Sequence, residues 1–240
     1  MNTNITENYE QLCKASADIL YNYIKENPFA VLALPTGNTP IGVYEKLIEL
    51  NRQNPLNWEN IKIFNLDEYV GLAHDSEQSF RSFMERHLYS KLNIPKENTF
   101  IPNGNAKNLE EECLEYETKI KEAGGIDLAV LGVGVNGHIG FNEPKTRFDQ
   151  KTSVVTISEH TRQVNSKDFH SLEEVPKTAI TMGISTIMGA KKIILLASGT
   201  SKSVALKSLI EGPITEEFPV TVLRRHHDVT VIADRDSYSF

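Results

Sequence analysis

The stretch FAVLALPTGNTPIGVYEKLIEL, residues 29–50, contains the unit from which we expect the whole fold to be built. Its first part, FAVLALP (29–35), is a continuous apolar run of strand length, as expected of a strand buried on both faces of a sheet. The polar turn TGN follows, and Thr39 with Pro40 predicts a helix cap and a first helical position. A buried strand, a tight turn and a helix in direct succession indicate an α/β protein.

The same alternation of strand and helix continues along the chain. Apolar positions at helical spacing predict a first helix from about residue 6 to 26. The further expected strands are 61–69, 126–133, 191–198 and 229–233, and the further expected helices are 79–92, 108–125 and 201–213. Such alternation predicts a mostly parallel sheet covered on both faces. Without a repeat, linker or break in composition, we expect one domain over residues 1–240, in which the polar segment from about 145 to 182 forms a lid or small subsidiary element.

Composition excludes several classes of partner. The formal net charge is -7, and no basic tract offsets it, which argues against binding to nucleic acid or to an anionic membrane. The two cysteines, Cys13 and Cys113, lie in expected helices, so we expect no disulfide framework and a reducing compartment. The polar start MNTNITENYEQ does not resemble a secretory signal, and no apolar run approaches the length of a membrane span. We therefore expect a soluble, cytoplasmic protein with a small-molecule partner.

The glycine-rich stretch VLGVGVNGHIGFNEP, residues 130–144, follows one of the expected strands. Gly132, Gly134 and Gly137 match the spacing G-x-G-x-x-G, but a dinucleotide site also needs a helix immediately after these glycines. Here Gly140 and Pro144 interrupt any helix at once. We therefore expect the glycines to let the backbone turn sharply and approach a ligand closely.

The same loop contains His138 and, five residues later, Glu143. Histidine titrates near neutral pH, and a carboxylate partner can fix its tautomer, which suits proton transfer to and from a substrate oxygen. The alternative interpretation is a loop histidine that a nearby carboxylate holds for structural reasons only. The sequence leaves both interpretations open.

The turns that follow two of the expected strands have the features of anion-binding sites. In the turn after 29–35, Thr36, Gly37 and Asn38 precede a helix N-terminus, where exposed backbone amides favour a phosphate group. The stretch ASGTSKS (197–203) repeats this arrangement and adds Lys202 in the first helical turn, where the helix dipole disfavours a cation unless an anion is bound. The alternatives are an ordinary capped turn and a solvated lysine. Because ligands of open α/β sheets collect at the carboxyl ends of the strands, both motifs lie where a ligand is expected.

A pair of acidic residues follows another apolar strand, in NLDEY (65–69). At least one of the carboxylates of Asp67 and Glu68 should face the ligand crevice, where a carboxylate with a tuned pKa can remove a proton from carbon. The alternative is a solvated loop acid or a helix cap.

Histidines elsewhere do not predict a metal site. His226 and His227 are adjacent, and neither a cysteine nor a carboxylate stands at ligand spacing from them. His160 and His170 lie in the polar segment without any ligand pattern. We expect no bound metal.

Taken together and in this order, these motifs resemble the glucosamine-6-phosphate deaminase family. The matching pieces span nearly the whole chain and are LPTGNTPIGVY, FNLDEYVGL, SFRSFM, LGVGVNGHIGFNEP, HTRQVNSKDF, TMGISTIM and SGTSKSVAL. The resemblance implies a Rossmann-like, three-layer α/β/α sandwich and conversion of glucosamine 6-phosphate and water to fructose 6-phosphate and ammonia. It also implies that neither a metal nor an organic cofactor is needed.

The resemblance also implies roles for the residues of the site. Asp67 resembles the base that carries a proton between C2 and C1 of the sugar, and His138 resembles the acid and base that opens the pyranose ring, with Glu143 as its partner. Many members of the family carry Asp where this chain has Asn136, which can orient the histidine through a hydrogen bond but cannot carry charge. The catalytic set implied by the resemblance is therefore Asp67, Asn136, His138 and Glu143.

For the phosphate group, the resemblance implies ligands in the turn Thr36, Gly37, Asn38 and Thr39, together with Lys202 and Lys167. Lys167 stands where some members have Arg, so a single point charge replaces a two-pronged contact.

Two other functions remain to be weighed against the deaminase. A 6-phosphogluconolactonase has a similar fold and phosphate turn, but GHIGFNEP fits it poorly. A sugar-phosphate sensor that does not catalyse would not need Asp67, His138 and Glu143 together. Some deaminases are hexamers activated by N-acetylglucosamine 6-phosphate through basic residues, where this chain has Ser153 and Val155, and they have a longer C-terminal tail. We therefore expect an unregulated monomer or low-order homo-oligomer.

Overall fold

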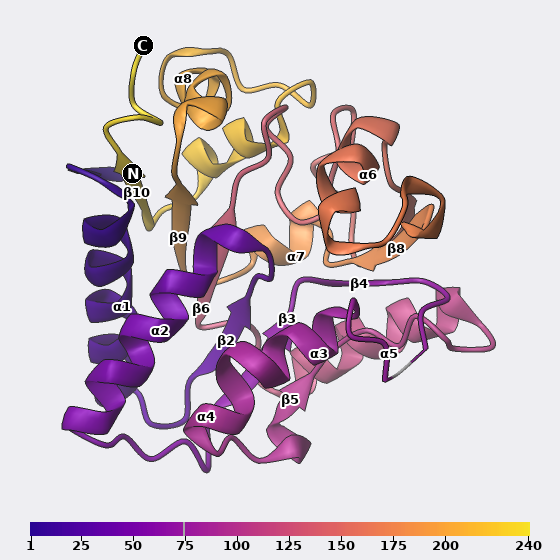
Figure 1. Ribbon diagram of the computed structural model, residues 1–240, viewed down its shortest axis with the longest axis horizontal. Helices are drawn as coiled ribbons and strands as arrows, with labels where there is room; N and C mark the ends of the chain where they lie inside the picture. The colour runs from indigo at the N-terminus through magenta and orange to yellow at the C-terminus, as the bar shows by residue number, and fades with distance from the viewer. Residues whose placement is uncertain (74) are drawn as a thin grey trace.

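The structure, a computed structural model, describes residues 1–73 and 75–240 and has three layers, with helices on both sides of a parallel sheet (Figure 1). Within these residues the central sheet has seven strands in the order β1-β10-β9-β6-β2-β3-β5, and its neighbouring strands are parallel. The strands are β1 (Asn2–Thr6), β2 (Val31–Leu34), β3 (Lys62–Asn65), β5 (Thr99–Phe100), β6 (Leu128–Gly132), β9 (Lys192–Ala197) and β10 (Val229–Asp234). The expected Rossmann-like α/β/α class is confirmed.

Two apolar layers enclose this sheet, because consecutive strand residues point to opposite faces. On β2, Val31 and Ala33 belong to one layer, whereas Leu32 and Leu34 belong to the other. One face is covered by α5 (Leu109–Glu122), α7 (Ile184–Met188), α8 (Ser203–Glu211) and the 3-10 helix η6 (Pro219–Arg225). The opposite face is covered by α1 (Tyr9–Glu26), α2 (Asn38–Gln53) and the continuous run of α3 (Phe80–Met84), the π-helix η1 (Glu85–Tyr89) and α4 (Ser90–Leu92).

The start of α2 differs from the sequence prediction. Thr39 was expected to be the cap, but the helix begins at Asn38 and its N-cap residue is Gly37, which has φ of 93° and no side chain that could cap the helix. Glycine adopts this backbone conformation without steric cost. Pro40 is therefore the third helical residue, where its missing N–H costs no hydrogen bond because the first four amides of a helix have no partner within it.

The expected strand 61–69 is also corrected, because it is two strands in two different sheets. β3 ends at Asn65, and β4 (Asp67–Tyr69) joins a small antiparallel sheet with the order β4-β8-β7. Asp67 pairs with Thr181 there, and the carbonyl of Leu66 accepts a hydrogen bond of 2.6 Å from the amide of Met182. The sequence does not reveal this switch, because the residues on both sides of it are buried.

The polar segment 145–182 contains most of this small sheet. Both expected strand pieces are present, as β7 (Ser153–Thr156) and β8 (Thr178–Thr181). Between them lie α6 (Glu159–Asn165) and the 3-10 helices η3 (Ser166–Asp168) and η4 (Leu172–Glu174). In Figure 1 this segment stands beside the carboxyl end of the central sheet. It is therefore placed to contribute side chains to a ligand bound at that end.

Several short elements were not predicted from the sequence. β1 is polar and exposed along most of its length, and it lies at the edge of the sheet, beside β10. β5 and the remaining 3-10 helices η2 (Lys96–Asn98) and η5 (Thr200–Lys202) have only two or three residues each, too few to form a pattern. In the part of the chain that the structure describes, none of the helices combines the length and the apolar character needed to cross a bilayer.

Candidate active site

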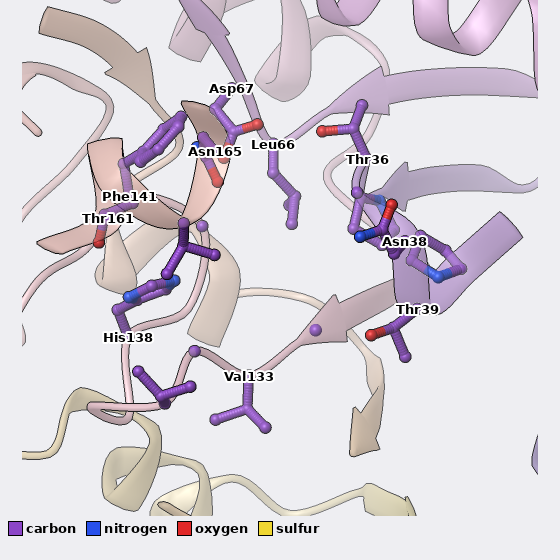
Figure 2. A pocket seen from close by; sticks show the side chains of 18 of the residues that line it. Thr36, Asn38, Thr39, Leu66, Asp67, Val133, His138, Phe141, Thr161 and Asn165 are labelled. Atoms are coloured by element: carbon purple, nitrogen blue, oxygen red, sulfur yellow. The ribbon is translucent and has the colours of Figure 1, made fainter. Parts of the chain in front are cut away.

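A cavity of about 560 Å³ opens at the carboxyl ends of the central strands. This size is typical of small-molecule sites. Figure 2 shows Thr36, Asn38 and Thr39 on one side of it, and His138 and Thr161 on the opposite side. We call the side with Thr36, Gly37, Asn38, Thr39, Lys167 and Lys202 the anchoring end, and the side with Asp67, Asn136, His138 and Glu143 the reacting end.

The uncapped start of α2 forms one wall of the anchoring end. Thr36, Gly37, Asn38 and Thr39 all line the cavity. Because no side chain caps this helix, its first amides are free to bind an anion, and the helix dipole favours negative charge there. Tyr9 of α1 supports the turn, because its hydroxyl donates a hydrogen bond of 3.0 Å to the carbonyl of Thr39.

Two lysines add positive charge to the anchoring end. Lys202 and Lys167 both line the cavity, and they come from the turn after β9 and from η3. Burial, and next the charge of Lys167, lowers the pKa of Lys202 below its ordinary value. Asp234 holds the turn that carries Lys202 by accepting a hydrogen bond of 3.0 Å from the amide of Gly199. Lys202 is half-buried and Lys167 is exposed, and an anion bound beside them would reduce the repulsion between their charges.

At the reacting end, the two acidic residues of NLDEY have different environments. Asp67 lines the cavity, and burial, with a smaller contribution from the charge of Glu68, raises its pKa from 3.8 to about 8. Glu68 points away and accepts hydrogen bonds from the amides of Phe80 and Arg81, so it caps α3. Asp67 is therefore the carboxyl group that can exchange a proton with a ligand.

The loop that carries His138 is attached to β8, the strand that pairs with the strand of Asp67. The amide of Phe141 donates a hydrogen bond of 3.1 Å to the hydroxyl of Thr181, which is the pairing partner of Asp67 on β8. A Cβ atom added to Gly140 would lie 3.4 Å from a carboxylate oxygen of Asp67. Both Asp67 and His138 line the cavity, so one small ligand can contact both.

His138 lies against Gly134, and this contact explains one glycine of the G-x-G-x-x-G pattern. A Cβ atom at Gly134 would overlap the imidazole ring. The ring Nδ1 is buried without a hydrogen-bond partner and lies 3.7 Å from Oε2 of Glu143, a distance suited to an ion pair when the histidine is protonated. Gly134 therefore makes room for a histidine at the cavity wall, whereas the sequence suggested that the glycines let the backbone approach a ligand.

Glu143 and Asn136 do not line the cavity but lie behind His138. The side-chain amide of Asn136 donates a hydrogen bond of 2.7 Å to Oε2 of Glu143, and its oxygen accepts one of 3.2 Å from the amide of His138. Burial opposes ionisation of Glu143, but His138, Thr161 and Asn136 together outweigh it and lower its pKa to about 2. Glu143 is therefore a carboxylate at neutral pH.

Several residues of the cavity were not predicted from the sequence. Thr161, Val164, Asn165 and Asp168 come from α6 and η3, and the aromatic rings of Tyr69, Phe80 and Phe141 pack together along the wall beside Asp67. All of these side chains lie within the matching pieces of sequence, but none of them was singled out there as a site residue. The motif HTRQVNSKDF contains Thr161 and Asn165, but its spacing alone does not indicate which of its side chains reach the ligand.

Two of the histidines outside the His138 loop lie in surroundings that differ from each other. His226 is buried, and its Nε2 lies 2.7 Å from the carbonyl of Ala190. His160 lies at the rim of the cavity. Among residues 1–73 and 75–240, no group of three or more His, Cys, Asp or Glu side chains has a geometry that could hold a metal ion.

Known proteins are similar to this chain along most or all of its length. Residues 4–232 match the sequence profile of the family described as glucosamine-6-phosphate isomerases/6-phosphogluconolactonase. The chain is 52% identical to a glucosamine-6-phosphate deaminase of Thermoanaerobacter sp. (strain X514) over 239 residues, which are 100% of this chain and 94% of that protein.

Two solved structures show the same fold. One is a monomeric glucosamine-6-phosphate deaminase, with a TM-score of 0.98 and 46% identity over 100% of this chain and 99% of the other. The second is a 6-phosphogluconolactonase from Thermotoga maritima, with a TM-score of 0.75 and 22% identity over 97% and 98% of the two chains. At that identity, the second likeness extends to the fold alone.

Proposed function

Since the chain belongs to the glucosamine-6-phosphate isomerase/6-phosphogluconolactonase family, we propose that it converts glucosamine 6-phosphate and water to fructose 6-phosphate and ammonia in amino-sugar catabolism. It is an enzyme of the deaminase kind, and deaminases match it along its whole length. The observation that carries the proposal is the cavity itself, in which Asp67 and His138 face an uncapped helix N-terminus.

The first step opens the pyranose ring. His138 takes the proton of the C1 hydroxyl and returns a proton to the ring oxygen as the bond between C1 and that oxygen breaks. Glu143, which is ionised, stabilises the imidazolium that forms between these two transfers. Asn136 keeps Glu143 beside the ring and carries no charge that would compete with it.

The second step moves a proton from C2 to C1. Asp67 removes the proton from C2 of the open-chain sugar to give the enolate of the amino aldehyde, and it then returns this proton to C1. A proton passes from the nitrogen to O1, which leaves a hydroxyl at C1 and an imine at C2. Water adds to this imine and ammonia leaves, which gives the ketone of fructose 6-phosphate. A base with a pKa of about 8 is matched to this task, because it is strong enough to take a proton and also able to return it.

The phosphate group is the proposed ligand of the anchoring end. Thr36, Gly37, Asn38 and Thr39 supply amides and hydroxyls, and Lys167 and Lys202 supply charge. Binding energy gained at this distant group positions the reacting carbons against Asp67. The segment 145–182 carries Lys167 and is the proposed lid of a single domain, residues 1–240.

We also propose that the protein acts as a cytoplasmic monomer. The solved deaminase that it matches at 46% identity is monomeric, and both cysteines of this chain are free and buried, as in a reducing compartment.

The proposal is tested by incubating the protein with glucosamine 6-phosphate and measuring ammonia and fructose 6-phosphate in separate coupled assays. The expected result is that the two products form in equal amounts. Hydrolysis of 6-phosphogluconolactone without ammonia release would instead assign the chain to the other activity of the family. Binding of the amino-sugar phosphate without any product would identify a sensor.

A further inference from the structure

Glu143 lies between the His138 loop and helix α6, and its two carboxylate oxygens contact different elements. Oε2 faces the loop, where it accepts a hydrogen bond of 2.7 Å from Asn136 and lies 3.7 Å from Nδ1 of His138. Oε1 faces α6, where it accepts hydrogen bonds of 2.5 Å from the hydroxyl of Thr161 and 3.0 Å from that of Ser158. The orientation of the carboxylate is therefore determined from both sides.

We propose that Thr161 is a positioning residue, whose hydroxyl holds Oε1 of Glu143 so that Oε2 is directed at His138. The inference rests on the proposed function, because it concerns the ring-opening step. Thr161 is nearly fully buried on the His138 side of the cavity (Figure 2), so water does not compete freely for the same oxygen. A short hydrogen bond from a buried hydroxyl to a carboxylate is stronger than one between neutral groups.

Helix α6 also connects this contact to the rest of the cavity. Lys167 follows the helix directly in η3, and Asn165 in its last turn donates a hydrogen bond of 2.8 Å to the hydroxyl of Tyr69, two residues after Asp67. The helix that holds Glu143, the partner of His138, is therefore continuous with the turn that carries the proposed phosphate ligand Lys167. A bound phosphate that fixes α6 would consequently fix Glu143 as well.

The competing explanation is that Thr161 only stabilises the helix. Ser158 is the N-cap residue of α6, and its hydroxyl accepts a hydrogen bond from the amide of Thr161, so the cap does not need the hydroxyl of Thr161. That hydroxyl, together with His138 and Asn136, opposes the effect of burial on the pKa of Glu143. Among the described residues, His138 is the titratable group that faces this carboxylate, whereas α6 presents only hydroxyl groups to it.

The test compares Thr161→Val, which keeps the shape and removes the hydroxyl, with Thr161→Ser, which keeps the hydroxyl. We expect kcat for glucosamine 6-phosphate to fall roughly ten- to hundredfold in Thr161→Val, as the loss of one hydrogen bond to a charged group predicts. KM should stay within about twofold, because the anchoring end is unchanged. Thr161→Ser should restore most of the activity. Thr118→Val on the exposed face of α5 removes a comparable hydroxyl and should have no effect.

A second readout does not depend on turnover. The ¹⁵N signals of the His138 ring, which report the protonated nitrogen, should change in Thr161→Val and return in Thr161→Ser. Wild-type ring signals and wild-type kcat in Thr161→Val would overturn the inference, and so would equal losses in both variants, because keeping the hydroxyl would then not keep the activity. Absence of ammonia release by the wild-type protein would instead refute the proposed function, and the ring signals would still test the role of Thr161.

Discussion

The two ends of the cavity are built in different ways. Most of the anchoring end comes from one contiguous turn, Thr36 to Thr39, whose groups are placed by a single strand and the helix that follows it. The reacting end is assembled from strand β4, the His138 loop and helix α6, which belong to distant parts of the sequence. A group that binds a charged ligand can thus be supplied by local backbone geometry, whereas proton transfer requires side chains that only the tertiary fold brings together.

This difference predicts how substitutions act. A change at the reacting end should lower kcat, because it removes an interaction made in the transition state. A change at the anchoring end should mainly raise KM, because the phosphate group is held throughout the reaction. Each of the following experiments tests this division between the two ends.

The largest effect is expected for Asp67→Asn. The amide cannot accept the proton from C2, so kcat should fall about 10²–10⁴-fold, the usual contribution of one general base. Inhibition by inorganic phosphate should not change, since the anchoring end is intact. Asp18→Asn on α1, away from the cavity, is the matched control. Unchanged turnover in Asp67→Asn would remove this residue from its proposed role.

A somewhat smaller loss is expected for Gly134→Ala. The added methyl group overlaps the His138 ring, so the imidazole must move from its place beside Glu143. We expect kcat to fall about a hundredfold, the lower range for loss of an acid–base group, with a smaller change in KM. The unfolding midpoint, measured by circular dichroism, shows whether the fold is retained. A folded variant with wild-type kcat would show that the position of His138 is unimportant.

At the anchoring end, Lys202→Met should raise KM roughly ten- to hundredfold through the loss of one charged contact with phosphate, while kcat changes little. Lys207→Met is the control, because Lys207 is exposed on α8, the helix that begins directly after Lys202, and pairs only weakly with Glu211. A large fall in kcat at saturating substrate, with KM unchanged, would contradict the division between the two ends.

The pH dependence requires no substitution and concerns Asp67 alone. The base must be ionised to act, and its pKa is raised to about 8 by burial and next by Glu68. We therefore expect kcat/KM to rise with pH, by about tenfold per unit well below 8, and to level off above it. A profile that is flat from pH 6 to 9 would show that ionisation of Asp67 does not limit the reaction.

The sequence predicts much of the anchoring end and of the central sheet. The strands β2, β6, β9 and β10 were recognisable because a buried parallel strand is a continuous apolar run. The turn with Gly37 was recognisable because a strand, a glycine and a helix follow one another directly, although the helix starts one residue before Thr39.

The reacting end was predicted only in part. Asp67 and His138 were identifiable as strand-end and loop groups, but the change of sheet at Leu66 that places Asp67 depends on pairing with β8, more than a hundred residues later. The contact between Thr161 and Glu143 also depends on tertiary packing. A local pattern records which side chains are buried but does not record which strand or helix is their neighbour.

The most direct test of the account is a crystal structure with 2-amino-2-deoxyglucitol 6-phosphate, the reduced open-chain analogue that cannot isomerise. We expect its phosphate at the amides of Gly37 to Thr39 and at Lys202, its C2 about 3–3.5 Å from the carboxylate of Asp67, and its C5 hydroxyl at His138. A complex in which the phosphate occupies the reacting end, or in which no carbon comes within reach of Asp67, would contradict the proposed arrangement.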